Sequence, residues 1–159
     1  MEFSGLLSVI VFLPLAGALA IVLLLKSDSS IRWFAGATSF VGLLLSLYIF
    51  TSYDTGLGGV QLVDRLSGWV PAIAGDKFAV EYYMGIDGLS APLVLLTGIL
   101  GFVAVVASWH IRNRVKEYFA WILVLQTGVL GVFTSLDFLM FFLFWELELI
   151  PMYFLIAIW

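Results

Sequence analysis

Two carboxylates stand inside an apolar stretch near the end of the sequence, FFLFWELELIPMYF at residues 141–154. Glu146 and Glu148 are separated by one residue, and Pro151 follows them closely. At the centre of a membrane-spanning helix an Asp, Lys or Arg costs roughly 2.5–3.5 kcal/mol, and we expect a Glu to cost a similar amount. Because such residues are usually retained for function, both carboxylates are candidates for ion or proton handling.

The spacing of the two carboxylates places them on different faces of a helix. Successive residues turn by about 100°, so Glu146 and Glu148 point about 200° apart. They therefore cannot work together as an acid–base pair on one partner. If the helix begins after Asp137, Glu146 lies about 13 Å along it and Glu148 about 3 Å further, which puts both near the middle of a bilayer.

Pro151 adds a polar backbone group at the same depth. A proline inside a helix has no N–H to donate and clashes with the carbonyl four residues earlier, which here belongs to Leu147. In lipid, a carbonyl freed in this way needs water or a neighbouring polar side chain. Two carboxylates and a free carbonyl suit a proton or cation route. The alternative is a protonated glutamate that only forms a hydrogen bond between helices.

The composition indicates that the chain lies in a membrane. Of its 159 residues, 63% are hydrophobic and 11% are charged, and the mean hydropathy is +1.13. Soluble domains have about 45–50% apolar and about 25% charged residues. There is no cysteine, which excludes disulfides and thiolate metal sites. The few basic residues form no cluster with aromatic residues, so we expect no binding of nucleic acid.

Five stretches are long and apolar enough to cross a bilayer as helices, which takes about 20 residues. They are Phe3–Leu25, Trp33–Tyr53, Ile86–Trp109, Phe119–Leu136 and Phe138–Trp159. We therefore predict an all-α membrane protein with five transmembrane helices. Residues 1–53 hold two helices, 54–85 form an external loop long enough for a short hairpin, and 86–159 hold three helices. The first charge is Glu2, so we expect a retained first helix and not a signal peptide.

Lysine and arginine residues set the expected orientation of the chain. Most of them lie in the links after the first and third stretches: Lys26, Arg32, Arg112, Arg114 and Lys116. The loop before the third stretch holds only Arg65 and Lys77. Because cytoplasmic links carry the excess of positive charge, we expect the N-terminus outside. No lysine or arginine lies inside the five stretches, so an ionised Glu146 needs a counter-charge from outside this segment.

Aromatic residues at the ends of the stretches agree with this orientation, since tryptophan and tyrosine concentrate at membrane interfaces. The tryptophans at the expected cytoplasmic ends are Trp33, Trp109, Trp121 and Trp159, and the tyrosines at the expected outer ends are Tyr53, Tyr82 and Tyr83.

Polar and small residues in the fourth stretch fit structural roles. Thr127, Gly131 and Ser135 recur every four residues, the spacing that lets membrane helices pack closely. We expect Gln126 to form a hydrogen bond to a neighbouring helix, with a part in hydrating a proton path as the alternative. His110, in the preceding link, is expected to be an interfacial residue and not a metal ligand.

The segment GIDGLSAP, residues 85–92, opens the third stretch. Asp87 or Ser90 can cap the N-terminus of this helix and lie at the positive end of its dipole. Pro92 is tolerated in a first helical turn. We therefore expect Asp87 and Ser90 to have a structural capping role.

Two segments together carry a family resemblance. MGIDGLSAPLVLLTG (84–98) followed by FFLFWELELIPMYFLIAIW (141–159) resembles the start of subunit M (chain 4) of respiratory complex I, the antiporter-like, proton-translocating subunit of NADH-quinone oxidoreductase. The order and spacing of the two motifs agree with that family as well. WELELIP is similar to the form in cyanobacterial and chloroplast NAD(P)H-plastoquinone oxidoreductases. The resemblance is strong over 80–159, whereas 1–79 share mainly the helix pattern.

The resemblance implies the N-terminal third of a subunit with about fourteen transmembrane helices and an outer N-terminus. It implies that Glu146 is an essential carboxylate, which pairs with a lysine two helices further on and so controls the proton affinity of a central lysine. Glu148 carries over less firmly, because some members have an apolar residue there. The lysines of the proton path would lie beyond Trp159, so this segment cannot complete a proton channel.

The resemblance also implies partners and a location. NADH, flavin, iron–sulfur clusters and quinone would belong to other subunits, so no cofactor is expected in this chain. Partners would be the other membrane-arm subunits of complex I and the lipid bilayer. The expected location is a bacterial inner (plasma) membrane, with a thylakoid or organellar inner membrane as alternatives. Two other functions stay open: a subunit of a multi-subunit Na⁺/H⁺ antiporter without a redox partner, and a structural fragment that only scaffolds an assembly.

Overall fold

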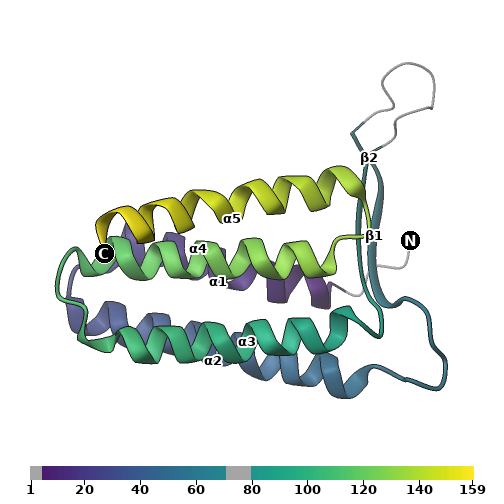
Figure 1. Ribbon diagram of the computed structural model, residues 1–159, viewed down its shortest axis with the longest axis horizontal. Coiled ribbons are helices and arrows are strands. Elements are labelled where there is room, and N and C mark those ends of the chain that lie inside the picture. Colours follow the sequence, from purple (N-terminus) through teal and green to yellow (C-terminus); the bar gives the residue numbers. More distant parts are fainter. Residues whose placement is uncertain (1–4, 71–79) are drawn as a thin grey trace.

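The computed structural model describes residues 5–70 and 80–159, which form five long helices and a two-stranded sheet (Figure 1). The helices are α1 (Leu6–Leu24), α2 (Asp28–Ser52), α3 (Ser90–Ala107), α4 (Val115–Thr134) and α5 (Phe138–Ile158). A short 3-10 helix, η1 (Ser108–His110), continues α3, and the strands are β1 (Gln61–Val70) and β2 (Val80–Ile86). Lys77, which entered the charge count of the long loop, lies outside the described residues.

The five helices are those that the apolar stretches predict, and each is long and apolar enough to cross a membrane. The predicted ends were wrong in several places. α2 and α4 begin earlier, at Asp28 and Val115, because polar first turns extend them beyond the apolar run. Ile86 belongs to β2, and Ser135 and Leu136 follow the end of α4.

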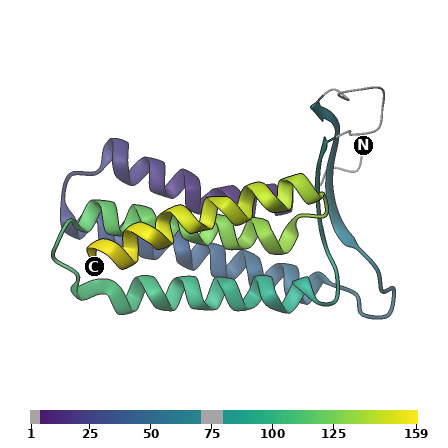
Figure 2. The same ribbon diagram turned by 45° about the horizontal axis from the view of Figure 1, so that its top comes forward.

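The long loop contains the short hairpin that its length suggested. β1 and β2 pair in antiparallel fashion, with Asp64 opposite Met84. Met84 also forms a β-bridge with Ser135, and the N–H of Leu136 donates to the Tyr83 carbonyl at 2.9 Å. The hairpin is therefore attached to the link between α4 and α5, at the end of the bundle where α1 begins (Figures 1 and 2).

α4 is the central helix of the bundle. It contacts all four other helices, and its residues Phe119, Leu123 and Leu130 are almost completely buried. α5 lies along α4 on the outside of the bundle (Figure 2). Of the residues of α5, only Met140, Phe144 and Pro151 are buried among the described parts of the chain. Most of the α5 surface is therefore left for lipid or for further protein.

Two glycines let α5 approach α4 closely. A Cβ atom on Gly131 would overlap the aromatic ring of Phe144, and one on Gly128 would lie 2.8 Å from the Cβ of Glu148. The sequence predicts Gly131 at a helix contact. In the structure, the second small residue of this contact on α4 is Gly128, three residues before Gly131. Ser135 lies beyond the helix end, where its hydroxyl donates to the Gly131 carbonyl at 2.6 Å. The close contact places the middle of α5, with both glutamates, directly beside α4.

A buried carboxylate ties the hairpin to the first helix. Asp64 is completely buried, and it accepts hydrogen bonds from the N–H groups of Gly5 at 2.6 Å and Ser8 at 2.9 Å. The Ser8 hydroxyl donates to Asp64 at 2.9 Å and lies 2.7 Å from the Tyr82 hydroxyl. Asp64 thus caps the positive end of α1 from another element. Burial, reinforced by the charge of Asp64, raises the pKa of Tyr82.

Replacing Asp64 with asparagine is expected to loosen the start of α1. Asparagine has one acceptor oxygen instead of two, and a hydrogen bond to a charged group contributes about 1.5–3 kcal/mol. Hydrogen exchange of the Gly5 and Ser8 amides should therefore accelerate about tenfold or more. Asp54→Asn is the matched control, because Asp54 is exposed and its carboxylate accepts a local bond from the Gly56 N–H at 2.7 Å. Equal exchange in both variants would contradict the capping role.

Candidate functional site

The two glutamates lie near the middle of α5, and an N-cap fixes their depth. The Asp137 carboxylate accepts hydrogen bonds from the N–H groups of Leu139 at 2.9 Å and Met140 at 3.1 Å, so the 21-residue helix begins directly after Asp137. The prediction that both carboxylates lie near the middle of a bilayer assumed this same helix start. Glu146 and Glu148 therefore sit about halfway along the helix axis.

The glutamates face different surroundings. Glu148 is half-buried, and its Cβ packs against Gly128 of α4. Glu146 is exposed and borders a surface hollow of about 330 Å³, lined also by Leu149, Ile150, Tyr153 and Phe154. The structure thus keeps the two carboxylates apart, one toward α4 and one away from the described bundle. Neither forms an ion pair with any residue that the structure describes.

Pro151 lies inside α5 and is buried. The helix continues past it to Ile158, so Pro151 changes the hydrogen bonding without ending the helix. Because proline has no N–H, the Leu147 carbonyl receives no bond from position 151. The Leu147 carbonyl, which lies between the two carboxylates in the sequence, therefore lacks its usual backbone donor.

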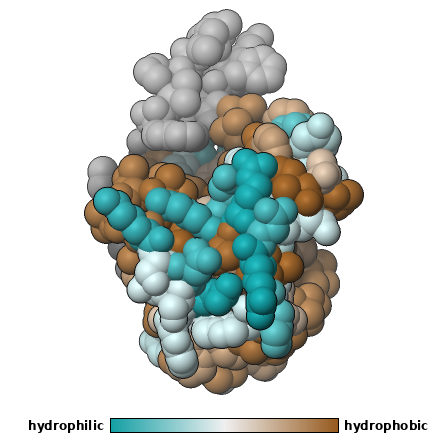
Figure 3. Space-filling model, turned by 90° about the vertical axis from the view of Figure 1, so that its left-hand side faces the viewer, coloured by the Kyte–Doolittle hydropathy of each residue, from teal (hydrophilic) through white to brown (hydrophobic). Residues whose placement is uncertain are grey.

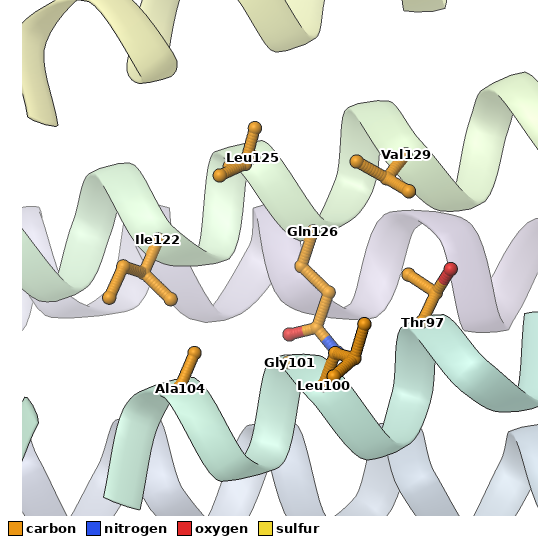
Figure 4. A pocket seen from close by; sticks show the side chains of 8 residues that line it. All are labelled: Thr97, Leu100, Gly101, Ala104, Ile122, Leu125, Gln126 and Val129. Atoms are coloured by element: carbon orange, nitrogen blue, oxygen red, sulfur yellow. The ribbon is translucent and has the colours of Figure 1, made fainter. Parts of the chain in front are cut away.

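Gln126 is a second polar group at mid-depth, on the opposite side of α4 from α5. It is 4% exposed, and the Ser39 hydroxyl of α2 lies at hydrogen-bond range of its Oε1, at 3.5 Å. Its side chain reaches from α4 toward Gly101 and Leu100 of α3 (Figure 4). A Cβ on Gly101 would overlap the Gln126 amide, so this glycine makes the space that the amide occupies.

The Nε2 atom of Gln126 has no hydrogen-bond partner among the described residues. It borders a cavity of about 250 Å³, lined mainly by apolar side chains and by Thr97. An unsatisfied buried donor costs about 1–3 kcal/mol, and this cavity is large enough for a water molecule. The arrangement joins helices α2, α3 and α4 through one amide, and it leaves the Nε2 N–H groups for a further ligand.

Asp87 and Ser90 form a reciprocal cap at the start of α3. The Asp87 carboxylate accepts from the Ser90 N–H at 2.7 Å and from the Leu89 N–H at 3.0 Å, while the Ser90 hydroxyl accepts from the Asp87 N–H at 2.8 Å. The hydrogen bond from the Ser90 N–H is the main reason why the pKa of Asp87 is lowered. Both residues are occupied in holding the helix end.

Positive charge gathers at the end of the bundle opposite the hairpin, and Figure 3 shows the hydrophilic residues that cover this end. The basic residues of the two links there are Lys26, Arg32, Arg112, Arg114 and Lys116. Trp33 and Trp109 meet edge to face beside them, with ring centroids 5.3 Å apart, and the Trp159 indole donates to the Asn113 carbonyl at 2.7 Å. The exposed His110 also lies at this end, as expected of an interfacial residue.

Two contributing residues escaped the sequence analysis. Asp64 had no assigned role, because its hydrogen-bond partners are 56 to 59 residues away in the sequence. Gly128 lies outside the four-residue pattern, because its distance to Gly131 is three residues. A pattern of small residues at either spacing includes Gly128, whereas nothing in the local sequence marks Asp64 as buried.

Solved structures identify the general class of protein. The chain superposes on part of respiratory complex I from Thermus thermophilus with bound NADH, with a TM-score of 0.72, 26% identity, and coverage of 91% of this chain and 27% of that one. It also shares its fold with part of an archaeal membrane-bound sulfane sulfur reductase, with a TM-score of 0.77, 19% identity, and coverage of 97% and 23%. The chain is thus a multi-pass membrane protein with the fold of respiratory-complex membrane subunits.

Sequence comparison shows similarity to one particular subunit. The chain is 39% identical over 154 residues to NAD(P)H-quinone oxidoreductase chain 4 of Gloeobacter violaceus, covering 96% of this chain and 28% of the relative. It is 42% identical over 154 residues to a chain 4 of Synechococcus sp. strain JA-3-3Ab, with the same coverage. No protein-family profile matches. The predicted resemblance to subunit M (chain 4) is therefore confirmed for this segment, which spans a little over a quarter of its relatives' length.

Proposed function

We propose that this chain forms the N-terminal part of a membrane-arm subunit of an NAD(P)H-quinone oxidoreductase, and that this subunit couples electron transfer to proton translocation. The names of the relatives and the shared fold support this proposal. The chain would be a non-redox part of the translocase. NADH, flavin, iron–sulfur clusters and quinone would be held by partner subunits, and the other membrane-arm subunits would be its direct neighbours.

Glu146 is the proposed proton-transfer residue. The observation that carries this assignment is its position, halfway along α5 on the face that the described helices leave open. A carboxylate there needs a partner from further protein, because it is costly against lipid alone. The proposed partner is a lysine in the second helix after Trp159. Glu148 has the secondary role, since it already packs against Gly128 of α4.

A glutamate–lysine pair of this kind can act as a switch. A nearby positive charge favours the ionised carboxylate, whereas removal of that charge in a low-dielectric environment favours the neutral acid. Movement of the lysine toward or away from Glu146 would therefore drive release or uptake of a proton. The free Leu147 carbonyl beside Pro151 can hold a water molecule at the same depth.

The proposed orientation has the N-terminus and the hairpin on the outer side, within a subunit of about fourteen helices. The lysine and arginine residues at the end opposite the hairpin support this orientation through the positive-inside rule. The proposed location is a bacterial inner (plasma) membrane, with a thylakoid or organellar inner membrane as alternatives. In this orientation, the loop of residues 54–85 lies outside, between the two helices of residues 1–53 and the three helices of residues 86–159.

Proton uptake by inverted membrane vesicles that contain the complete assembly tests this function. The proposal predicts a pH gradient that needs NADH or NADPH together with a quinone, and that forms equally well without Na⁺. A pH change driven by a Na⁺ gradient in the absence of both nucleotides would instead identify an antiporter subunit. Intact assembly with normal nucleotide-driven pumping in a Glu146→Gln variant would leave only a scaffold role for this chain.

A further inference from the structure

An apolar groove runs between α2 and α3 and begins at the positively charged end of the bundle. Its volume is about 480 Å³, and its lining is entirely apolar: Trp33, Gly36, Ala37, Phe40, Phe102, Val106 and Trp109. The Trp33 and Trp109 rings meet at one end of the groove, and Phe40 and Phe102 meet further along, with ring centroids 5.5 Å apart. Gly36 leaves room beside the Trp109 ring, which a Cβ at this position would contact at 3.5 Å.

Arg32 precedes the first lining residue, Trp33, at the charged end of the groove. It lies one helical turn before Gly36 on the same face of α2. Its Nη2 donates to the Ile111 carbonyl at 3.1 Å, so the guanidinium group bridges from α2 to the link after α3. Its buried Nε has no hydrogen-bond partner in the part of the chain that the structure describes. The hydrogen bond to Ile111 therefore holds a positive charge at this end of the groove.

The surrounding charge selects the sign of a ligand. The links at this end, residues 26–32 and 111–117, contain five basic residues and two acidic ones, Asp28 and Glu117. Glu117 is already paired with Arg114 at 2.6 Å. The local field therefore favours an anion, and the groove below favours a hydrocarbon chain.

We infer that this groove binds an anionic phospholipid, with an acyl chain against Phe40 and Phe102 and with the phosphate at Arg32. Trp33 and Trp109 meet at the charged end of the groove, and tryptophan concentrates at the level of lipid headgroups, which matches the junction between chain and phosphate. The inference needs only a bilayer around the bundle, so it stands whether or not the subunit translocates protons.

Photolabelling of the complete assembly in vesicles tests the site. The vesicles consist of phosphatidylcholine with a small share of a probe that carries a diazirine in its acyl chain, either phosphatidylglycerol or phosphatidylcholine with identical chains. We expect the anionic probe to label the peptides 33–40 and 102–109 about fivefold more than the zwitterionic probe, the factor that one basic residue provides. Equal labelling by the two probes, or no labelling because protein covers the groove, would overturn the inference.

Two pairs of variants separate the charge from the groove. Arg32→Gln should remove the preference for the anionic probe, whereas Arg114→Gln, at an exposed and already paired residue, should keep it. Gly36→Leu should reduce labelling by both probes because it fills the groove. Ala104→Leu is the matched control, since it fills the separate cavity between α3 and α4. A preference that survives Arg32→Gln would overturn the assignment of the phosphate.

Discussion

Replacing Glu146 with glutamine is expected to abolish proton translocation by the complete subunit, whereas Glu148→Gln should have the smaller effect. Glutamine keeps the shape and the hydrogen bonding of the side chain but can neither release a proton nor attract a lysine. Glu146 is the carboxylate on the open face of α5, and Glu148 is held against Gly128. The measurement is the pH gradient formed by inverted vesicles per electron pair delivered to quinone.

The Glu148→Gln variant is the matched control for this experiment. Both substitutions remove one carboxylate from the same helix at nearly the same depth, so a general loss of membrane insertion would affect them equally. The amount of assembled subunit in each membrane must be measured beside the gradient. Equal losses of translocation, or a greater loss in Glu148→Gln, would overturn the assignment of Glu146.

The second large effect is expected from Gly131→Leu, which should detach α5 from α4. A Cβ atom at this position already overlaps the Phe144 ring, and overpacking of a tight contact costs about 1–3 kcal/mol, occasionally more. Translocation should be lost with it, because α4 no longer holds the helix that carries Glu146. The measurement is the amount of assembled subunit, together with hydrogen exchange of the α5 amides.

Two further variants show whether the Phe144 contact is responsible. Val129→Leu adds bulk to the same helix, but on the side that borders the 250 Å³ cavity, and should be tolerated. Phe144→Ala should rescue Gly131→Ala, because it removes the ring that the new methyl group meets. If Gly131→Leu assembled as well as Val129→Leu, the close approach of α4 and α5 would have no importance for assembly.

The sequence predicts most of the fold because the helices are set by the bilayer. Five apolar runs of sufficient length give five helices. The links after the first and third runs bring their basic residues to one end, which Figure 3 shows as a hydrophilic surface. The ends of the helices are harder to predict from hydropathy. The polar first turn of α2 at Asp28 and the bridge from Ser135 to Met84 depend on the interface and on the hairpin, not on apolar runs.

The site is predictable to the extent that it follows from helix geometry. Side chains two positions apart on a helix must point in different directions. The structure places Glu146 outward and Glu148 toward α4. What the sequence could not predict are contacts between distant residues. Asp64 reaches the start of α1. The predicted hydrogen bond between Gln126 and a neighbouring helix is confirmed, but its partner, Ser39 on α2, is 87 residues away in sequence. These contacts depend on the tertiary arrangement of the helices and the hairpin, which no local pattern encodes.

The most direct test of the central proposal, that Glu146 is half of a proton switch, is an experimental structure of the complete membrane assembly. It gives the distance between the Glu146 carboxylate and the nearest lysine Nζ atom beyond Trp159. The proposal predicts a lysine of the second following helix within about 4 Å, the limit for an ion pair, in at least one state of the enzyme. A Glu146 side chain that faces lipid in every state, or a lysine paired with Glu148 instead, would contradict it.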